Sequence, residues 1–200
     1  MNLSADGIRK IIEWETGGER EYDIHPEWPG EQSGITIGIG WDLGHTPSTD
    51  TTRAWRAHLD AATLAQLVGV SGRKGKDAQE VLPLVRHLVV PWAAAMAVFE
   101  AVTIPTWYLR MLRICPQADA LPGDCAAALL SLCFNRGIST VGDRRREMAD
   151  IQRHLRDGRP EAIPSELRGM CRLWPDSKGL RRRRAEEAEL FERGLAARGD

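Results

Sequence analysis

The first residues of the chain carry apolar side chains at the spacing of one helix face. Four positions share that face at intervals of three and four residues: Ile8, Ile11, Ile12 and Glu15. Ser4 precedes them as a suitable N-cap, and glycines at 17 and 18 follow them. The pattern predicts a helix over residues 4–16 whose apolar face ends on the carboxyl group of Glu15.

Residues 19–34 include several prolines and glycines and indicate a loop. Residues 35–41 then alternate β-branched and small residues, which predicts a short strand or one arm of a hairpin. Gly38 and Gly40 in this stretch have no side chain, so another group could approach the backbone closely there.

From about residue 50 onward the spacing of apolar residues is helical. The predicted helices cover residues 51–68, 75–88, 91–102, 105–113, 122–136, 145–157, 160–168 and 178–197. We therefore expect an α+β fold, predominantly helical, in a single domain over residues 1–200. A small sheet-containing N-terminal lobe would occupy residues 1–50, and a larger helical lobe would occupy residues 51–200.

Composition and charge exclude some classes of protein. The chain has 200 residues, of which 42% are hydrophobic and 28% charged, and its formal net charge is −1. Nucleic-acid-binding proteins are usually strongly basic, so this balance argues against such a partner. No apolar run approaches the roughly 18–20 residues that span a bilayer, so no membrane insertion is expected. The histidines and cysteines show no metal-ligand spacing, so no metal site is predicted.

The start of the chain lacks the basic region and apolar run of a secretory signal. We expect synthesis in the cytoplasm, with cysteines that are reduced and mostly buried. A substrate in the periplasm or the cell wall would then be reached only after release or secretion by another system.

Glu15 is the most informative side chain of the first helix. Apolar surroundings disfavour a charged carboxylate, which raises its pKa and suits the group to act as a general acid near neutral pH. Glu13 lies on a polar face four residues after Arg9, and that pairing would keep Glu13 ionised. The alternative is that Glu15 lies at a frayed helix end and reaches water.

Thr36 and Asp42 bound the glycine-rich stretch. Asp42 could organise a turn, or it could be the second carboxylate of a glycosidase, which needs one protonated and one ionised carboxyl group. The hydroxyl group of Thr36 could position a water molecule, although threonine is also a common strand residue.

Together these residues form a pattern that resembles a known family. The stretch Thr36-Ile37-Gly38-Ile39-Gly40 resembles the core motif of phage-type lysozymes, where it follows a helix ending in glutamate and glycine, as Glu15-Thr16-Gly17 does here. The longer string WPGEQSGITIGIGWDLG, residues 28–44, is similar to the pesticin-like branch of that superfamily. In that branch the functional aspartate comes six positions after the threonine, as Asp42 does after Thr36.

The resemblance implies a lysozyme-like fold and hydrolysis of bacterial peptidoglycan. It implies that Glu15 is the general acid and that Asp42 and Thr36 hold the attacking water. It also implies inversion at the sugar carbon, for which the two carboxyl groups lie roughly 6.5–9.5 Å apart. Phage lysozymes place their aspartate before the threonine, and Asp23 is nearest to that position here. The pesticin-like pattern favours Asp42 over Asp23.

Several other residues are candidates for binding the sugar or the peptide. Trp28 and Trp41 flank the motif and could stack on a sugar, and Gly38 would leave room for substrate beside the strand. Asn135 and Arg136 belong to a stretch that resembles the helix end facing the cleft in these enzymes. They could equally form an ordinary helix C-terminus.

Arginines occupy positions 181–184, and glutamates follow at 186, 187, 189 and 192. These charges alternate at helical spacing, which favours a solvated, ion-paired helix over a nucleic-acid site.

We therefore predict a muramidase that cleaves the β-1,4 bond between N-acetylmuramic acid and N-acetylglucosamine, as a monomer and without a cofactor. Two alternatives stay open. A wall-binding relative could keep the cleft and have lost turnover. A lytic transglycosylase would use the sugar's own alcohol in place of water and would need no water-positioning aspartate.

Overall fold

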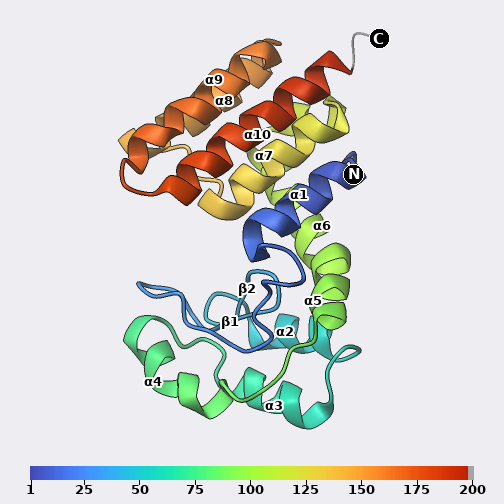
Figure 1. The fold of residues 1–200 in the computed structure, drawn as a ribbon, viewed down its shortest axis with the longest axis vertical. Coiled ribbons are helices and arrows are strands. Elements are labelled where there is room, and N and C mark those ends of the chain that lie inside the picture. The colour runs from blue at the N-terminus through green and yellow to red at the C-terminus, as the bar shows by residue number, and fades with distance from the viewer. Residues whose placement is uncertain (198–200) are drawn as a thin grey trace. The chain divides into compact units, whose positions relative to one another are not determined.

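A computed structural model describes residues 1–197. Within that range the chain is predominantly helical, with a two-stranded antiparallel sheet near its start (Figure 1). This agrees with the expected α+β class. The chain divides into two compact units, which we call the terminal unit (Met1–Trp14 and Thr106–Asp200) and the central unit (Glu15–Pro105).

We expected a boundary between two lobes near residue 50. The two units instead meet between Trp14 and Glu15 and between Pro105 and Thr106. The reason is that α1 (Ala5–Thr16) groups with the C-terminal half of the chain as far as Trp14. Gly7 lies so close to Ala127 that a side chain at position 7 would collide with it, and the Ser4 hydroxyl is hydrogen-bonded to Asp124. The first helix is thus part of the core of the terminal unit.

The predicted boundaries of the first helix are confirmed within one residue. The Ser4 hydroxyl accepts a hydrogen bond from the Gly7 N–H at 2.9 Å, as an N-cap does. Ile11 and Ile12 are buried, whereas Glu13 is exposed, so the helical phase is also as predicted. The helix ends at Thr16, and Gly17 follows with a φ of 73°.

The central unit contains a β-hairpin of β1 (Thr36–Ile37) and β2 (Trp41–Asp42), in which Thr36 pairs with Asp42. Gly38 has a φ of 56°, and a Cβ atom at this position would lie 2.6 Å from Cη2 of Trp55. The hairpin turn therefore needs glycine both for its backbone conformation and for the close approach of an indole ring, as the sequence suggested.

Four helices complete the central unit: α2 (Ser48–Trp55), α3 (Ala61–Gly69), α4 (Gly75–Val85) and α5 (Trp92–Val98). The prediction of one helix over residues 51–68 was wrong. The Asp60 carboxylate accepts hydrogen bonds from the N–H groups of Ala62 and Thr63 at 3.0 and 2.9 Å, so a new helix begins there.

The predicted break before Pro105 was also wrong, because α5 leads through a π-helical turn (Phe99–Thr103) directly into α6 (Ile104–Ile114). The wider turn before Pro105 accommodates a residue that has no N–H to donate.

The remaining helices of the terminal unit are α7 (Gly123–Arg136), α8 (Arg146–Arg156), α9 (Ile163–Gly169) and α10 (Lys178–Ala196). Short 3₁₀ helices cover Pro116–Ala120, Asp143–Arg145, Pro160–Ala162 and Met170–Leu173. Helix α7 is buried from Cys125 to Cys133 and lies beside α10 (Figure 1). None of the helices within residues 1–197 has the length and apolar character needed to cross a bilayer.

The arginine run on α10 is not the fully solvated face that the sequence favoured. Arg183 and Arg184 are 6% and 0% exposed, and both are paired with the fully buried carboxylate of Glu187. Ser131 of α7 donates a hydrogen bond to the same carboxylate at 2.6 Å. The interface between α7 and α10 is therefore built partly on buried charge.

Candidate active site

The central unit has a hollow of about 150 Å³ beside the end of α1 and strand β1. Residues of the first helix, the following loop and the strand line it: Glu15, Thr16, Glu21, Tyr22, Asp23, His25, Glu27, Thr36, Ile37 and Gly38. Glu15, in the last turn of α1, is half-buried. The structure thus brings together three of the residues that the sequence singled out for chemistry: Glu15, Thr36 and the alternative aspartate, Asp23.

Thr36 is fixed on both sides of its strand. Its backbone pairs with Asp42 in the hairpin, and it exchanges two hydrogen bonds with Glu27, at 3.0 and 2.7 Å, in an isolated bridge. These bonds engage both backbone polar groups of Thr36, a lining residue of the hollow, so its hydroxyl group is its remaining polar group.

Asp23 is held in its ionised form. Burial raises the pKa of Asp23. A hydrogen bond from the His25 N–H at 2.9 Å and an ion pair with Arg86 at 2.9 Å together lower it by more than burial raises it, so the pKa lies below the usual range. The hollow therefore contains a carboxylate that remains a proton acceptor in mildly acidic solution.

Replacing Arg86 with glutamine should raise the pKa of Asp23, because both the cation and its hydrogen bond to the carboxylate are lost. The lowered pKa of Asp23 contributes stability above its unfolded-state pKa, and this contribution is lost as the pH falls through the folded-state pKa. In Arg86→Gln this stabilising contribution of Asp23 should be lost at a higher pH than in the wild type. NMR titration of the Asp23 carboxyl carbon measures the shift. Arg53→Gln, whose arginine pairs with Asp50, should leave the titration unchanged.

The sequence did not indicate that Tyr22 and His25 line the hollow. The Tyr22 hydroxyl donates to the carbonyl oxygen of Val90 at 3.0 Å, and Nδ1 of His25 lies 2.9 Å from the carbonyl oxygen of Leu88. Burial, and then the charge of Asp23, raise the pKa of Tyr22 to about 12. These contacts fasten the loop after α1 to the segment before α5, a pairing that no local sequence pattern signals.

Asp42 does not line the hollow. Its Oδ1 accepts backbone hydrogen bonds from Gly34 at 3.2 Å, Gly44 at 2.8 Å and His45 at 3.1 Å. A Cβ atom on Gly34 would collide with this oxygen. The carboxylate thereby joins the loops before and after the hairpin, which is the turn-organising role that the sequence left open for it.

The two tryptophans that flank the motif have structural contacts. Trp41 is buried, donates from Nε1 to the Thr51 hydroxyl at 3.2 Å, and packs edge-on against Trp55 at a ring-centroid distance of 6.0 Å. Its ring faces are thus in the core of the central unit. Trp28 is half-buried and donates from Nε1 to the Ser33 carbonyl oxygen at 3.1 Å. Trp28 does not line the hollow, and its partly exposed ring is the more accessible of the two for stacking on a sugar.

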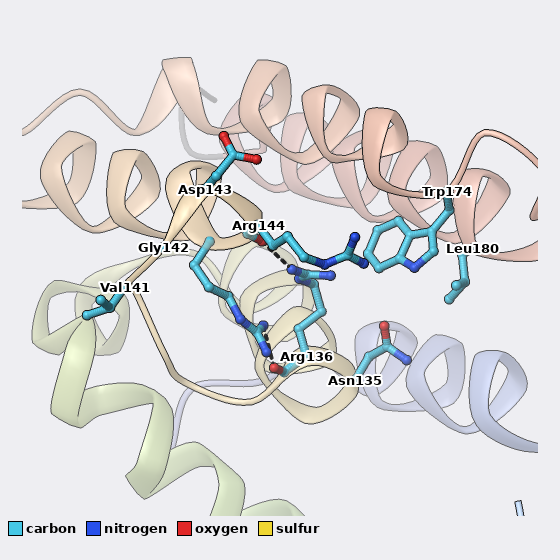
Figure 2. A pocket seen from close by; sticks show the side chains of 9 residues that line it. Asn135, Arg136, Val141, Gly142, Asp143, Arg144, Trp174 and Leu180 are labelled. Carbon is cyan, nitrogen blue, oxygen red and sulfur yellow. Dashed lines mark hydrogen bonds between the residues drawn. The ribbon is translucent and has the colours of Figure 1, made fainter. Parts of the chain in front are cut away.

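Asn135 and Arg136 lie in the terminal unit, at the end of α7. They line a separate hollow with the segment Val141–Arg145, Trp174 and Leu180 (Figure 2). The helix ends at Arg136, and Gly137 follows with a φ of 74°. The residues therefore form a helix C-terminus, and they also line a hollow.

Glu13 is exposed whereas Glu15 is half-buried, a difference that the helical phase predicted. A hydrogen bond from Lys10 at 2.9 Å, and the charge of that lysine, hold the pKa of Glu13 below its usual value. The partner is Lys10 and not Arg9, because Arg9 is paired with Asp6. Glu13 is therefore an ionised surface group and a poor proton donor.

No protein-family model matches the chain, and no curated protein matches it. Within residues 1–197 no three histidine, cysteine, aspartate or glutamate side chains gather as a metal site would require. The function must therefore be inferred from the side chains of the hollow.

Proposed function

We propose that this chain is a lysozyme-like peptidoglycan hydrolase, a muramidase that cleaves the β-1,4 bond between N-acetylmuramic acid and N-acetylglucosamine. The observation that carries the proposal is the gathering of Glu15, Asp23 and Thr36 around one hollow. These are the residue types, in the chain order, that the phage-type lysozyme pattern calls for. A glycosidase needs a proton donor and an ionised carboxylate, and Asp23 has the lowered pKa of the second.

The proposed reaction is a single displacement at the anomeric carbon. Glu15 gives its proton to the glycosidic oxygen as the bond to that carbon breaks. A water molecule held by Thr36 and Asp23 attacks the carbon from the other face and transfers its proton to Asp23. The products are two sugars with free hydroxyl groups, with inverted configuration at the new reducing end.

We assign to Asp23 the role of the second, water-holding carboxylate, which the sequence favoured for Asp42. Asp42 has three backbone partners and does not line the hollow, whereas Asp23 lines it beside Glu15. The aspartate therefore precedes the threonine, as in phage lysozymes. The glycine-rich string still resembles the pesticin-like branch.

The products of digestion test this proposal against its alternatives. Purified sacculi incubated with the protein should release fragments that end in reducing N-acetylmuramic acid, measurable by mass spectrometry after borohydride reduction. Fragments with anhydro ends would instead indicate a lytic transglycosylase. Co-sedimentation with sacculi without any fragment release would indicate a wall-binding protein, and either result would overturn the proposal.

A further inference from the structure

The hollow at the end of α7 is lined on one side by arginines. It has a volume of about 620 Å³ and includes Arg136, Arg144 and Arg145. Figure 2 shows the side chains of Arg136 and Arg144 extending toward the ring of Trp174. The guanidinium carbon of Arg136 lies 4.7 Å from the centre of that ring. Two cationic groups and an aromatic face thus meet at one place.

Backbone contacts hold two of these arginines, Arg136 and Arg145, in position. Nη2 of Arg136 donates to the carbonyl oxygen of Arg144 at 2.6 Å, and Nη1 of Arg145 donates to the carbonyl oxygen of Arg136 at 2.5 Å. Nε of Arg136 is buried, and it has no hydrogen-bond partner within the part of the chain that the structure describes. A buried donor in this state is unfavourable unless something accepts from it.

No carboxylate of the lining balances this charge. Asp143, the acidic residue of the lining, is paired with Arg172 at 3.2 Å and points away from Arg136 in Figure 2. Burial lowers the pKa of Arg136 to about 10, the neighbouring charges of Arg145, Arg184 and Arg144 add to this effect, and the charge of Glu147, which is outside the lining, opposes it. Gathered like charges repel one another, and an anion placed among them would relieve the repulsion.

We propose that this hollow binds an oxyanion, a carboxylate or phosphate group whose oxygens accept hydrogen bonds from Arg136 and Arg144 beside the ring of Trp174. Guanidinium groups offer paired donors that match the oxygens of both kinds of anion. The site lies in the terminal unit and does not depend on the proposed hydrolase activity.

NMR titration tests the site directly. The whole protein, labelled with ¹⁵N, is titrated with inorganic phosphate and, separately, with succinate at constant ionic strength. The Arg136 Nε–H signal is assigned by its loss in Arg136→Lys. We expect saturable shifts of this signal and of the Trp174 indole N–H. Saturation by phosphate alone identifies a phosphate site, and saturation by succinate alone identifies a carboxylate site.

Two variants separate a specific site from general attraction. Arg144→Gln removes one guanidinium group and keeps the carbonyl oxygen that Arg136 uses, so the affinity should fall at least about tenfold. Arg110→Gln removes an arginine that stacks on Trp107, at 4.6 Å, outside the hollow, and it should leave the affinity unchanged. Shifts that do not saturate with either anion, or an equal loss in both variants, would overturn the proposal.

Discussion

Asp23→Asn should lower the kcat for wall hydrolysis by about 10²–10⁴-fold, the usual contribution of a positioned proton-transfer group. Asparagine keeps the size of the side chain but cannot accept a proton from water. Its effect on the free energy of unfolding should stay within about 1 kcal/mol, because the ion pair that it breaks, with Arg86, is about half exposed on both sides. Initial rates of reducing-end release, together with urea denaturation, measure the two effects.

Asp42→Asn is the matched control for the second carboxylate. The side-chain oxygen of the introduced asparagine can still accept the N–H groups of Gly34, Gly44 and His45, so the hairpin loops should persist. The kcat should then stay within several-fold of wild type. If Asp42→Asn abolishes hydrolysis in a folded protein while Asp23→Asn does not, the catalytic aspartate is Asp42 and the proposed role of Asp23 is wrong.

Glu187→Gln should destabilise the terminal unit by about 3–5 kcal/mol, because it removes a buried carboxylate that is paired with two buried arginines. The Glu187 carboxylate is fully buried and lies 3.1 Å from Nε of Arg183 and 2.7 Å from Nη2 of Arg184. A neutral amide of the same shape cannot replace that charge in a region of low dielectric constant. The free energy of unfolding measured in urea gives the change directly.

Glu192→Gln makes the same substitution on the same helix at an exposed ion pair. Glu192 contacts Arg168 at 2.6 Å with both side chains nearly half exposed, so the loss should stay below about 1 kcal/mol. Equal losses in the two variants would mean that the buried network between α7 and α10 contributes no more to stability than a surface pair does.

The local parts of the fold could be predicted from the sequence. The helix at residues 5–16, its serine cap and its buried face follow from short-range spacing, and α7 and α10 begin and end within a residue or two of their predicted positions. The sequence did not reveal the cap at Asp60 or the continuous helix through Pro105. Asp60 precedes two alanines, and an aspartate there can either lie inside a helix or cap a new one. Pro105 can likewise follow a break in a helix or be accommodated within a continuous one.

The candidate site was predictable only in part. Helical phase distinguished Glu15 from Glu13, and in the structure Glu15 is half-buried while Glu13 is exposed and paired with Lys10. The placement of Asp23 depends on its contact with Arg86, which lies 63 residues away in the sequence. Arg183 and Arg184 are buried because α10 packs against α7. The spacing of charges along α10 carries no information about that packing, and it therefore predicted a solvated face. Long-range contacts of this kind leave no periodic pattern in the sequence.

The most direct test of the account is the release of reducing ends from purified sacculi by the wild type, Glu15→Gln and Glu13→Gln, all confirmed as folded by circular dichroism. The wild type should hydrolyse the wall, Glu13→Gln should match it within about twofold, and Glu15→Gln should be slower by at least about 10²-fold, because it has no proton to give to the glycosidic oxygen. Equal rates for the wild type and Glu15→Gln, or no hydrolysis by the wild type, would contradict the assignment of this chain as a muramidase with Glu15 as its acid.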